Sequence, residues 1–129
     1  MKAARNAIRI RRSKARSVPS EHDEQVGFVN WFRSKFPGVL IHAIPNGGFR
    51  NIRLARRLVA EGVVAGIPDL FVPEWRLWIE MKRTGGHVVR KNQTTMAERL
   101  ESYGYTVILG IGAHDASQKV LEFYRNNSP

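Results

Sequence analysis

Three ionisable side chains interrupt two apolar runs in the middle of the chain, in the stretch GIPDLFVPEWRLWIEMKR at residues 66–83. Asp69 opens the first run, and Glu80 and Lys82 lie two residues apart in the second. Two carboxylates held close together repel each other when both are ionised, and a bound cation removes this conflict. A hard cation such as Mg²⁺ uses one or two carboxylates together with water and substrate phosphate. These residue types therefore predict a metal site for phosphoryl chemistry.

The spacing of Glu80 and Lys82 suits a shared site because alternate side chains of a strand point to one face, while Ile79 and Met81 would face the core. We expect the two runs to pair as a hairpin, which would bring Asp69 close to Glu80. Lys82 would then orient the attacking water or neutralise the charge that develops during phosphodiester hydrolysis. The alternative is a solvated strand face bearing Glu80 and Lys82, with Asp69 as a turn residue.

The segments before this hairpin predict two helices separated by a short strand. Ser20 is a suitable N-cap for a first helix, which Pro37-Gly38 ends and whose apolar residues recur at near-helical spacing: Val26, Phe28, Val29, Phe32 and Phe36. Residues 39–44 predict a buried strand that ends at the turn PNGG. Residues 49–62 then predict a helix whose core-facing residues would be Ile52, Ala55, Leu58 and Val59.

The segments after the hairpin complete an alternating pattern. A Gly85-Gly86 break precedes a helix over about 91–103, a strand over 106–111 and a helix over about 115–124. The resulting order, α-β-α-β-β-α-β-α, predicts an α/β fold with a mixed central β-sheet flanked by helices.

Composition and charge narrow the class of protein. The 129 residues lack cysteine, so a metal site would use oxygen or nitrogen ligands, and no apolar run is long enough to cross a bilayer. We expect a cytoplasmic protein without a membrane partner. The formal charge of +10 is concentrated in residues 1–18, which hold seven of the 21 Lys and Arg residues and no acid. We therefore expect a basic flexible tail at 1–19 and one domain at 20–129, with the tail either solubilising or contacting phosphates.

The motifs as a set resemble a known family. Pro68-Asp69 and Glu80-Met81-Lys82 resemble the metal site of the PD-(D/E)XK nuclease superfamily, which has a restriction-endonuclease-like core. The wider frame is similar to its virus-type replication-repair nuclease (VRR-NUC) branch: E-x-x-x-Q, PNGG followed by Arg, EG-x-x-x-G-x-PDL, IE-x-K and a later Gln, over residues 20–113. The resemblance implies that Asp69 and Glu80 are metal ligands and that Lys82 is the catalytic lysine.

Further site residues are expected around this centre. Glu21 can supply a third carboxylate, with Glu24 as its competitor, and Gln93 could hold phosphate or brace Lys82. The stretch Asn46-Gly47-Gly48 is typical of a turn, and the resemblance implies as an alternative that this loop lines the substrate groove with Arg50. Arg53 and Arg57 are either phosphate contacts or a solvated helix face. The four histidines, His22, His42, His87 and His114, show no metal-ligand spacing.

The expected function is that of an endodeoxyribonuclease, a hydrolase of ester bonds that depends on Mg²⁺ or Mn²⁺. The resemblance implies a Holliday-junction-resolvase-like enzyme that cuts branched or four-way DNA as a homodimer, in DNA replication, repair or recombination. It also makes a phage or prophage origin plausible, with action inside a bacterial or phage-infected host cell. The alternatives are a nucleic-acid-binding module that has lost catalysis and a nuclease of the same fold that acts on RNA.

Overall fold

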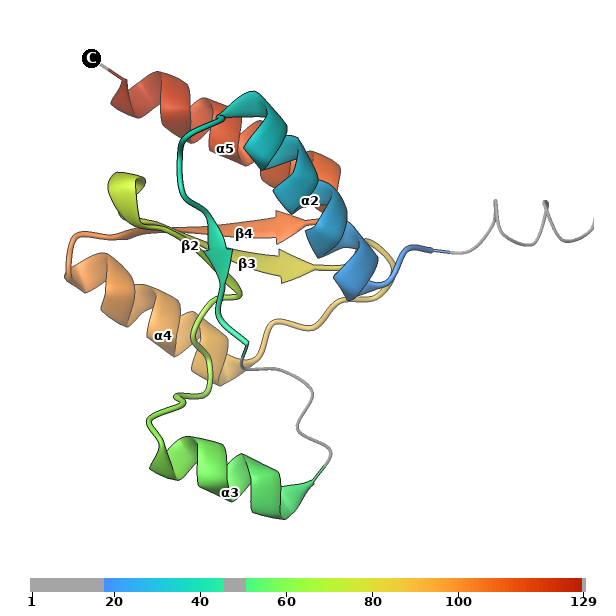
Figure 1. Cartoon of the computed structure of the whole chain (residues 1–129), viewed down its shortest axis with the longest axis vertical. Helices are drawn as coiled ribbons and strands as arrows, with labels where there is room; N and C mark the ends of the chain where they lie inside the picture. The colour runs from blue at the N-terminus through green and yellow to red at the C-terminus, as the bar shows by residue number, and fades with distance from the viewer. Residues whose placement is uncertain (1–17, 46–50, 129) are drawn as a thin grey trace, which may run out of the picture.

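The computed structural model describes residues 18–45 and 51–128 as one α/β layer structure (Figure 1). A central sheet has helices on both faces, as the order of predicted elements indicated. The elements follow in the order α2 (Glu21–Lys35), β1 (His42–Ala43), α3 (Ile52–Ala60), β2 (Leu70–Val72), η1 (Pro73–Trp75), β3 (Leu77–Lys82), α4 (Lys91–Ser102), β4 (Thr106–Ile111) and α5 (Ala113–Asn127). The predicted α/β class and mixed sheet are confirmed.

The four strands lie side by side in the order in which they occur along the chain. β1 pairs with β2 and β2 with β3 in antiparallel fashion, whereas β3 and β4 run parallel. The short 3₁₀ turn η1 closes the predicted β2–β3 hairpin, in which Leu70 pairs with Ile79. This register places Asp69, the residue before β2, beside Glu80 on β3. The hairpin therefore fixes two of the three ionisable groups in the central motif.

The hydrophobic core lies between the sheet and the helices α2 and α5. Alternate residues of β3, Leu77, Ile79 and Met81, are fully buried and pack in one cluster with Phe28 and Phe32 of α2. Glu80 and Lys82 point to the opposite face, which α4 partly covers (Figure 1). The two faces of β3 thus divide as predicted into a core face and a polar face.

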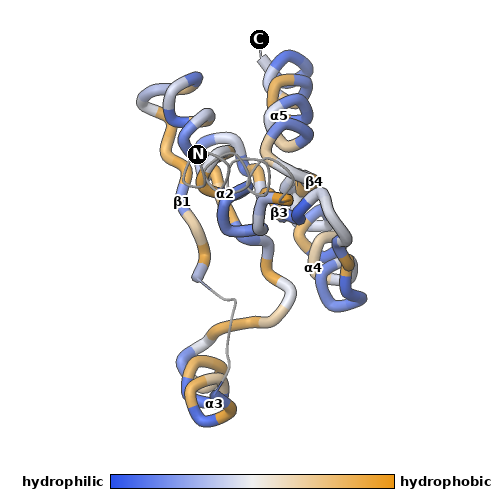
Figure 2. The backbone as a smooth tube through the Cα atoms, turned by 90° about the vertical axis from the view of Figure 1, so that its right-hand side faces the viewer, coloured by the Kyte–Doolittle hydropathy of each residue, from blue (hydrophilic) through white to orange (hydrophobic). Residues whose placement is uncertain are grey.

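The helix α3 differs from its prediction because it stands away from the sheet in both views (Figures 1 and 2). Its side chains were expected to face the core, but Ile52 and Val59 are 71% and 64% exposed, and Ala55 and Leu58 are only partly buried. The helix keeps its amphipathic sequence, with apolar residues on one side and Arg53 and Arg57 on the other. Periodicity predicted the helix correctly but assigned it the wrong partner, since no sheet face within the described residues covers its apolar side.

Three smaller predictions also change. The predicted strand at 39–44 is reduced to His42–Ala43, although the N–H of Ile44 still donates to the carbonyl of Asp69 at 2.8 Å. Val26 of α2 is 45% exposed because the helix turns this position away from the core. The last helix is longer than predicted, from Ala113 to Asn127.

Among the described residues, no helix is both long and apolar enough to span a membrane.

Candidate metal centre

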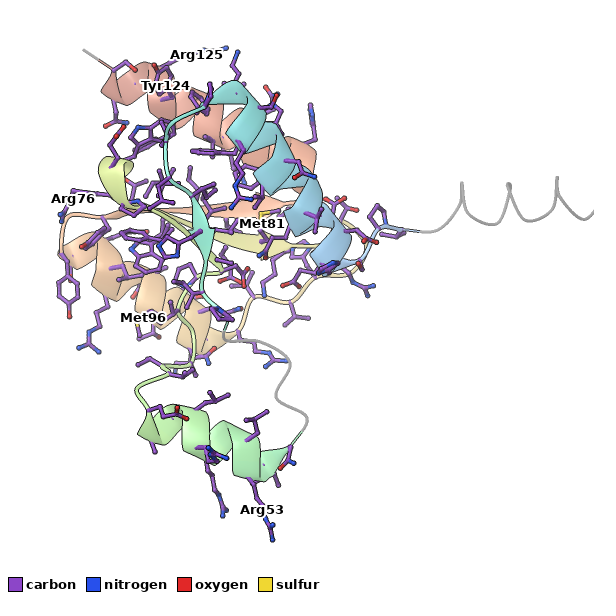
Figure 3. The ribbon with its side chains drawn as sticks, viewed as in Figure 1. Arg53, Arg76, Met81, Met96, Tyr124 and Arg125 are labelled. Carbon is purple, nitrogen blue, oxygen red and sulfur yellow. The ribbon has the colours of Figure 1, made fainter. Side chains whose placement is uncertain are left out.

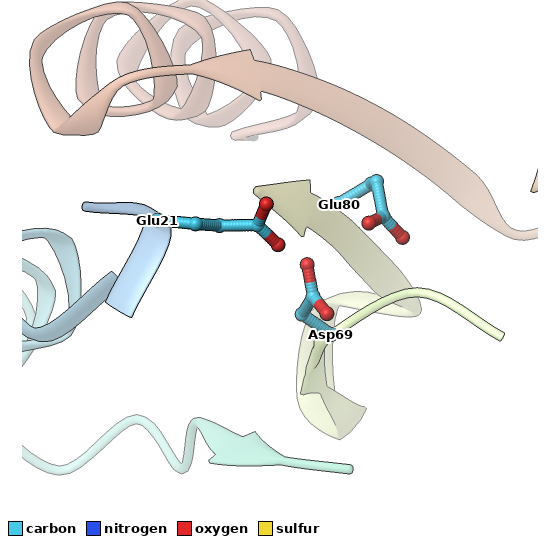
Figure 4. Close-up of side chains that lie close together, drawn as sticks. All are labelled: Glu21, Asp69 and Glu80. Atoms are coloured by element: carbon cyan, nitrogen blue, oxygen red, sulfur yellow. The ribbon is translucent and has the colours of Figure 1, made fainter. Parts of the chain in front are cut away.

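Three carboxylates from three separate elements converge at one end of the sheet (Figure 4). Glu21 is the first residue of α2, Asp69 precedes β2, and Glu80 lies in β3. Each offers one oxygen atom, and these three atoms all lie within 4.8 Å of one another. One ion at their centre could therefore contact all three groups.

Hydrogen bonds to both its side chain and its backbone carbonyl hold Asp69 in place. Its side-chain Oδ2 accepts a hydrogen bond from the N–H of Met81 at 2.8 Å, and its carbonyl accepts the bond from Ile44. The preceding residue, Pro68, is fully buried, and its ring fixes the backbone φ angle just before Asp69. The Asp69 carboxylate is thus tied to the strand that carries Glu80.

Glu80 is the most buried of the three acids, with 6% of its surface exposed. Gln93 Nε2 donates to Glu80 Oε1 at 3.1 Å, and Lys82 Nζ lies 3.7 Å from the same oxygen. Burial raises the pKa of Glu80 from 4.5 to about 8; the Asp69 carboxylate acts in the same direction, and Lys82 acts against it. In the absence of a cation, the site therefore holds a proton at neutral pH.

The structure separates the two glutamates that the sequence left as competitors. Glu24, one turn beyond Glu21, turns to the other side, where its Oε2 accepts a hydrogen bond from the N–H of Ala113 at the start of α5. A carboxylate at this position stabilises the positive end of the α5 dipole. Ser20 caps α2 by accepting the N–H of Asp23, so that Glu21 occupies the first helical position and faces Asp69 and Glu80.

The donor set fits a hard divalent cation. All three candidate ligand atoms are carboxylate oxygens, the type that Mg²⁺ and Mn²⁺ prefer. Burial is the main cause of the raised pKa of Glu80, and the nearby negative charge of Asp69 raises it further. A bound ion would supply that charge and, with a phosphodiester present, would act as a Lewis acid on its oxygen. The acidic cluster can therefore bind a metal ion.

These groups open into a cavity of about 650 Å³ that also contains Lys82 and Gln93. Gln93 was expected to hold phosphate or brace Lys82, and these roles stay predictions. In the structure, its amide donates to Glu80, and its Oε1 accepts the N–H of Arg90 at 3.0 Å. Lys82 is almost fully buried, with its amine beside Glu80. All five residues that the sequence placed at the centre of the site thus line one cavity.

The cavity also contains three basic residues that sequence reasoning did not place there, namely Arg83, His87 and Arg90. All three belong to the segment between β3 and α4. The sequence could have predicted this position. Glu80 and Gln93 both belong to the site, so the segment that connects them must pass close to it. His22 and His42 line a separate groove between α2 and β1, and His114 lines neither cavity.

The arginines predicted to contact nucleic acid lie elsewhere. Arg53 and Arg57 are exposed on α3 and do not line the carboxylate cavity; Arg53 extends away from the body of the molecule (Figure 3). Asn46 and Arg50 fall outside the described residues. Their roles in binding substrate stay predictions.

Comparison with solved structures identifies a protein of similar fold. No family model matches the sequence, and no curated protein matches it. A solved structure named as a VRR_NUC domain protein superposes with a TM-score of 0.70 and 26% sequence identity, over 84% of this chain and 91% of the other. This similarity confirms the resemblance to the VRR-NUC domain that the sequence motifs predicted, and the chain has the fold of a nuclease-type domain.

Proposed function

We propose that this protein is a metal-dependent, structure-selective DNA endonuclease that hydrolyses phosphodiester bonds in branched DNA, with residues 20–129 as its nuclease domain. One observation carries the proposal: Glu21, Asp69 and Glu80 meet within 4.8 Å of one another, and Lys82 lies beside Glu80 in the same cavity. This set supplies a cation site and a positively charged side chain, which phosphodiester hydrolysis requires.

Each residue has a distinct role in this proposal. Glu21, Asp69 and Glu80 bind Mg²⁺ or Mn²⁺, and Gln93 holds Glu80 in place through its amide. Lys82 orients the attacking water or stabilises the additional negative charge of the transition state. Its buried amine is well suited to this because a charge acts more strongly where water is excluded.

A homodimer acting on four-way junctions would match a two-fold enzyme to a two-fold substrate. The apolar residues of α3 support this part of the proposal, since Ile52 and Leu54 are 71% and 48% exposed in the single chain. A second copy that covers these residues would explain why their side chains lie uncovered in one chain. Ile52→Asp should then shift the protein from dimer to monomer in analytical ultracentrifugation, whereas Leu40→Asp, which alters a leucine that is 62% exposed outside α3 and outside the carboxylate cavity, should not.

Cleavage of defined DNA structures tests the function directly. A four-way junction, a flap, a splayed arm and a linear duplex are incubated with the protein in Mg²⁺, in Mn²⁺ and in EDTA. We expect metal-dependent cleavage of the branched substrates and no cleavage by Asp69→Ala or Glu80→Ala. Matched RNA junctions are digested in parallel, and preferential cutting of RNA would replace the DNA assignment.

The opposite result is equally clear. Binding of every branched substrate without cleavage in any metal would identify a nucleic-acid-binding module and refute the enzymatic proposal.

We also propose that the basic segment 1–19 contributes phosphate contacts. Removal of residues 1–17 should therefore flatten the dependence of binding on salt, because fewer counterions are released.

A further inference from the structure

The segment between β3 and α4, residues 83–90, forms one wall of the carboxylate cavity. Arg83, His87 and Arg90 all line the cavity, and all three are exposed to solvent. The same cavity is lined by Glu21, Asp69 and Glu80, of which only Glu80 is buried, so that acidic and basic side chains face one space. We name residues 83–90 the basic wall.

Hydrogen bonds connect the basic wall to the metal centre and also join two of its own residues. The N–H of Arg90 donates to Gln93 Oε1, and Gln93 Nε2 donates to Glu80, so a single side chain joins the end of the wall to a candidate ligand. At the other end, Arg83 Nε donates to the carbonyl of Gly86 at 3.3 Å, and Gly86 adopts a φ of +77° that favours glycine. These contacts fix the backbone at Arg90 and the guanidinium of Arg83, so both ends of the basic wall are held in place.

The formal charges of the cavity explain what the wall is needed for. When all three acids are ionised, their charge is balanced by Lys82, Arg83 and Arg90, with His87 counted as neutral. A divalent cation would make the cavity positive, and the positive side chains nearest to solvent are those of the wall. Without them, one divalent ion and Lys82 would only offset the three acids, which leaves no attraction for a polyanion.

The size of the cavity points to a ligand larger than an ion. Six waters around a metal ion occupy about 180 Å³ at about 30 Å³ each, whereas the cavity measures about 650 Å³. The basic wall lines part of this cavity. Guanidinium groups bind phosphate oxygens with two parallel hydrogen bonds, so Arg83 and Arg90 suit the phosphodiester backbone of a strand that crosses the centre.

We propose that the basic wall binds the phosphates on either side of the scissile one, and that Arg83, His87 and Arg90 position the substrate strand over the carboxylate cluster. This inference rests on the proposed function and deepens it by naming the side chains that hold the strand. It differs from the sequence prediction, which gave this role to Arg53 and Arg57 on α3.

Direct binding separates this inference from catalysis. The affinity for a fluorescent four-way junction is measured in Ca²⁺ over a range of salt concentrations for Arg83→Gln, Arg90→Gln and the double variant. Arg125→Gln, on the exposed end of α5 (Figure 3), removes the same charge away from the cavity and is the matched control. Arg53→Gln and Arg57→Gln test the competing surface.

We expect each wall variant to weaken binding by about five- to tenfold and the double variant by more than either alone, whereas Arg125→Gln changes it less than twofold. The slope of log affinity against log salt should fall by about 0.7 to 0.9 for each arginine that no longer neutralises a phosphate. Mn²⁺ binding, followed by thermal shift without DNA, should not weaken in the wall variants. Arg83→Lys should restore only part of the affinity, because lysine cannot form the paired hydrogen bonds.

Wall variants that bind as tightly as Arg125→Gln and show the same salt slope would overturn the inference. So would a loss of affinity confined to Arg53→Gln and Arg57→Gln. Wall variants that lose affinity in a protein that cuts nothing would leave the basic wall in place and refute the endonuclease activity. Failure of the inference and failure of the proposed function thus give different results.

Discussion

The buried carboxylate of Glu80 makes the stability of the metal-free protein depend on pH in an unusual direction. Its pKa is raised to about 8, so Glu80 is protonated at neutral pH when no cation is present. Glu80→Gln imitates this protonated form. Its Oε1 can still accept from Gln93, and its amide can donate to Asp69 in place of the acid proton. We therefore expect the variant to fold normally.

The sign follows from the two pKa values. Between 4.5 and about 8, the folded protein holds a proton that the unfolded chain has released, so the free energy of unfolding falls as the pH rises through this range. One pKa unit corresponds to about 1.4 kcal/mol, which sets a ceiling on the order of 5 kcal/mol. Because Asp69 and Glu80 share the effect, we expect about 2 to 3 kcal/mol.

Thermal unfolding in EDTA from pH 5.5 to 9 measures this effect. The parent and Glu80→Gln should unfold at similar temperatures at pH 5.5, and the variant should be more stable by roughly 10 °C at pH 9. Mg²⁺ should reverse the order at pH 9, because only the parent has the full set of carboxylates to bind it.

Glu101→Gln, which changes an exposed glutamate on α4, is the control and should follow the parent at every pH. Other groups titrate over the same range, so the informative quantity is the difference between parent and variant. A constant difference between pH 5.5 and 9 would refute the reasoning, because it would show that Glu80 does not exchange a proton in this range.

Three further predictions concern catalysis and stability. Lys82→Met should lower cleavage by roughly 100-fold or more in a quantitative nuclease assay while Mn²⁺ binding is kept, since the amine acts on the transition state. Gly66→Ala should cost about 2 to 4 kcal/mol in denaturant unfolding, because its φ is +89° and the new Cβ would lie 2.6 Å from the Asn92 carbonyl oxygen; Gly38→Ala, with φ +91° and open space, should cost only about 1 to 2 kcal/mol. Burial acts to raise the pKa of Asp115, but the hydrogen bond from the Ile111 N–H and the ion pair with Lys119 outweigh burial and lower this pKa. Asp115→Asn should therefore cost about 1 kcal/mol of stability at pH 7. The cost should decrease at acidic pH, where the carboxylate of the parent protein becomes protonated.

The sequence by itself determined the local parts of the site. The two-residue period of a strand put Glu80 and Lys82 on the same face, and the short connection between two apolar runs predicted the hairpin that brings Asp69 beside them. Ser20 marked the start of α2 because its side chain can satisfy a free N–H at the helix terminus. These features depend on residues close together in the chain, and the structure contains all of them.

Only the tertiary structure decided which distant residues meet. Glu21 and Glu24 have similar local surroundings in the sequence, but the packing of α2 beside α5 directs Glu24 to the N–H of Ala113 and leaves Glu21 to face Asp69. The apolar side of α3 looked like a core face, yet the chain carries this helix away from the sheet. Periodicity reveals that a helix has an apolar side, whereas the neighbour of that side depends on how segments far apart in sequence pack in space.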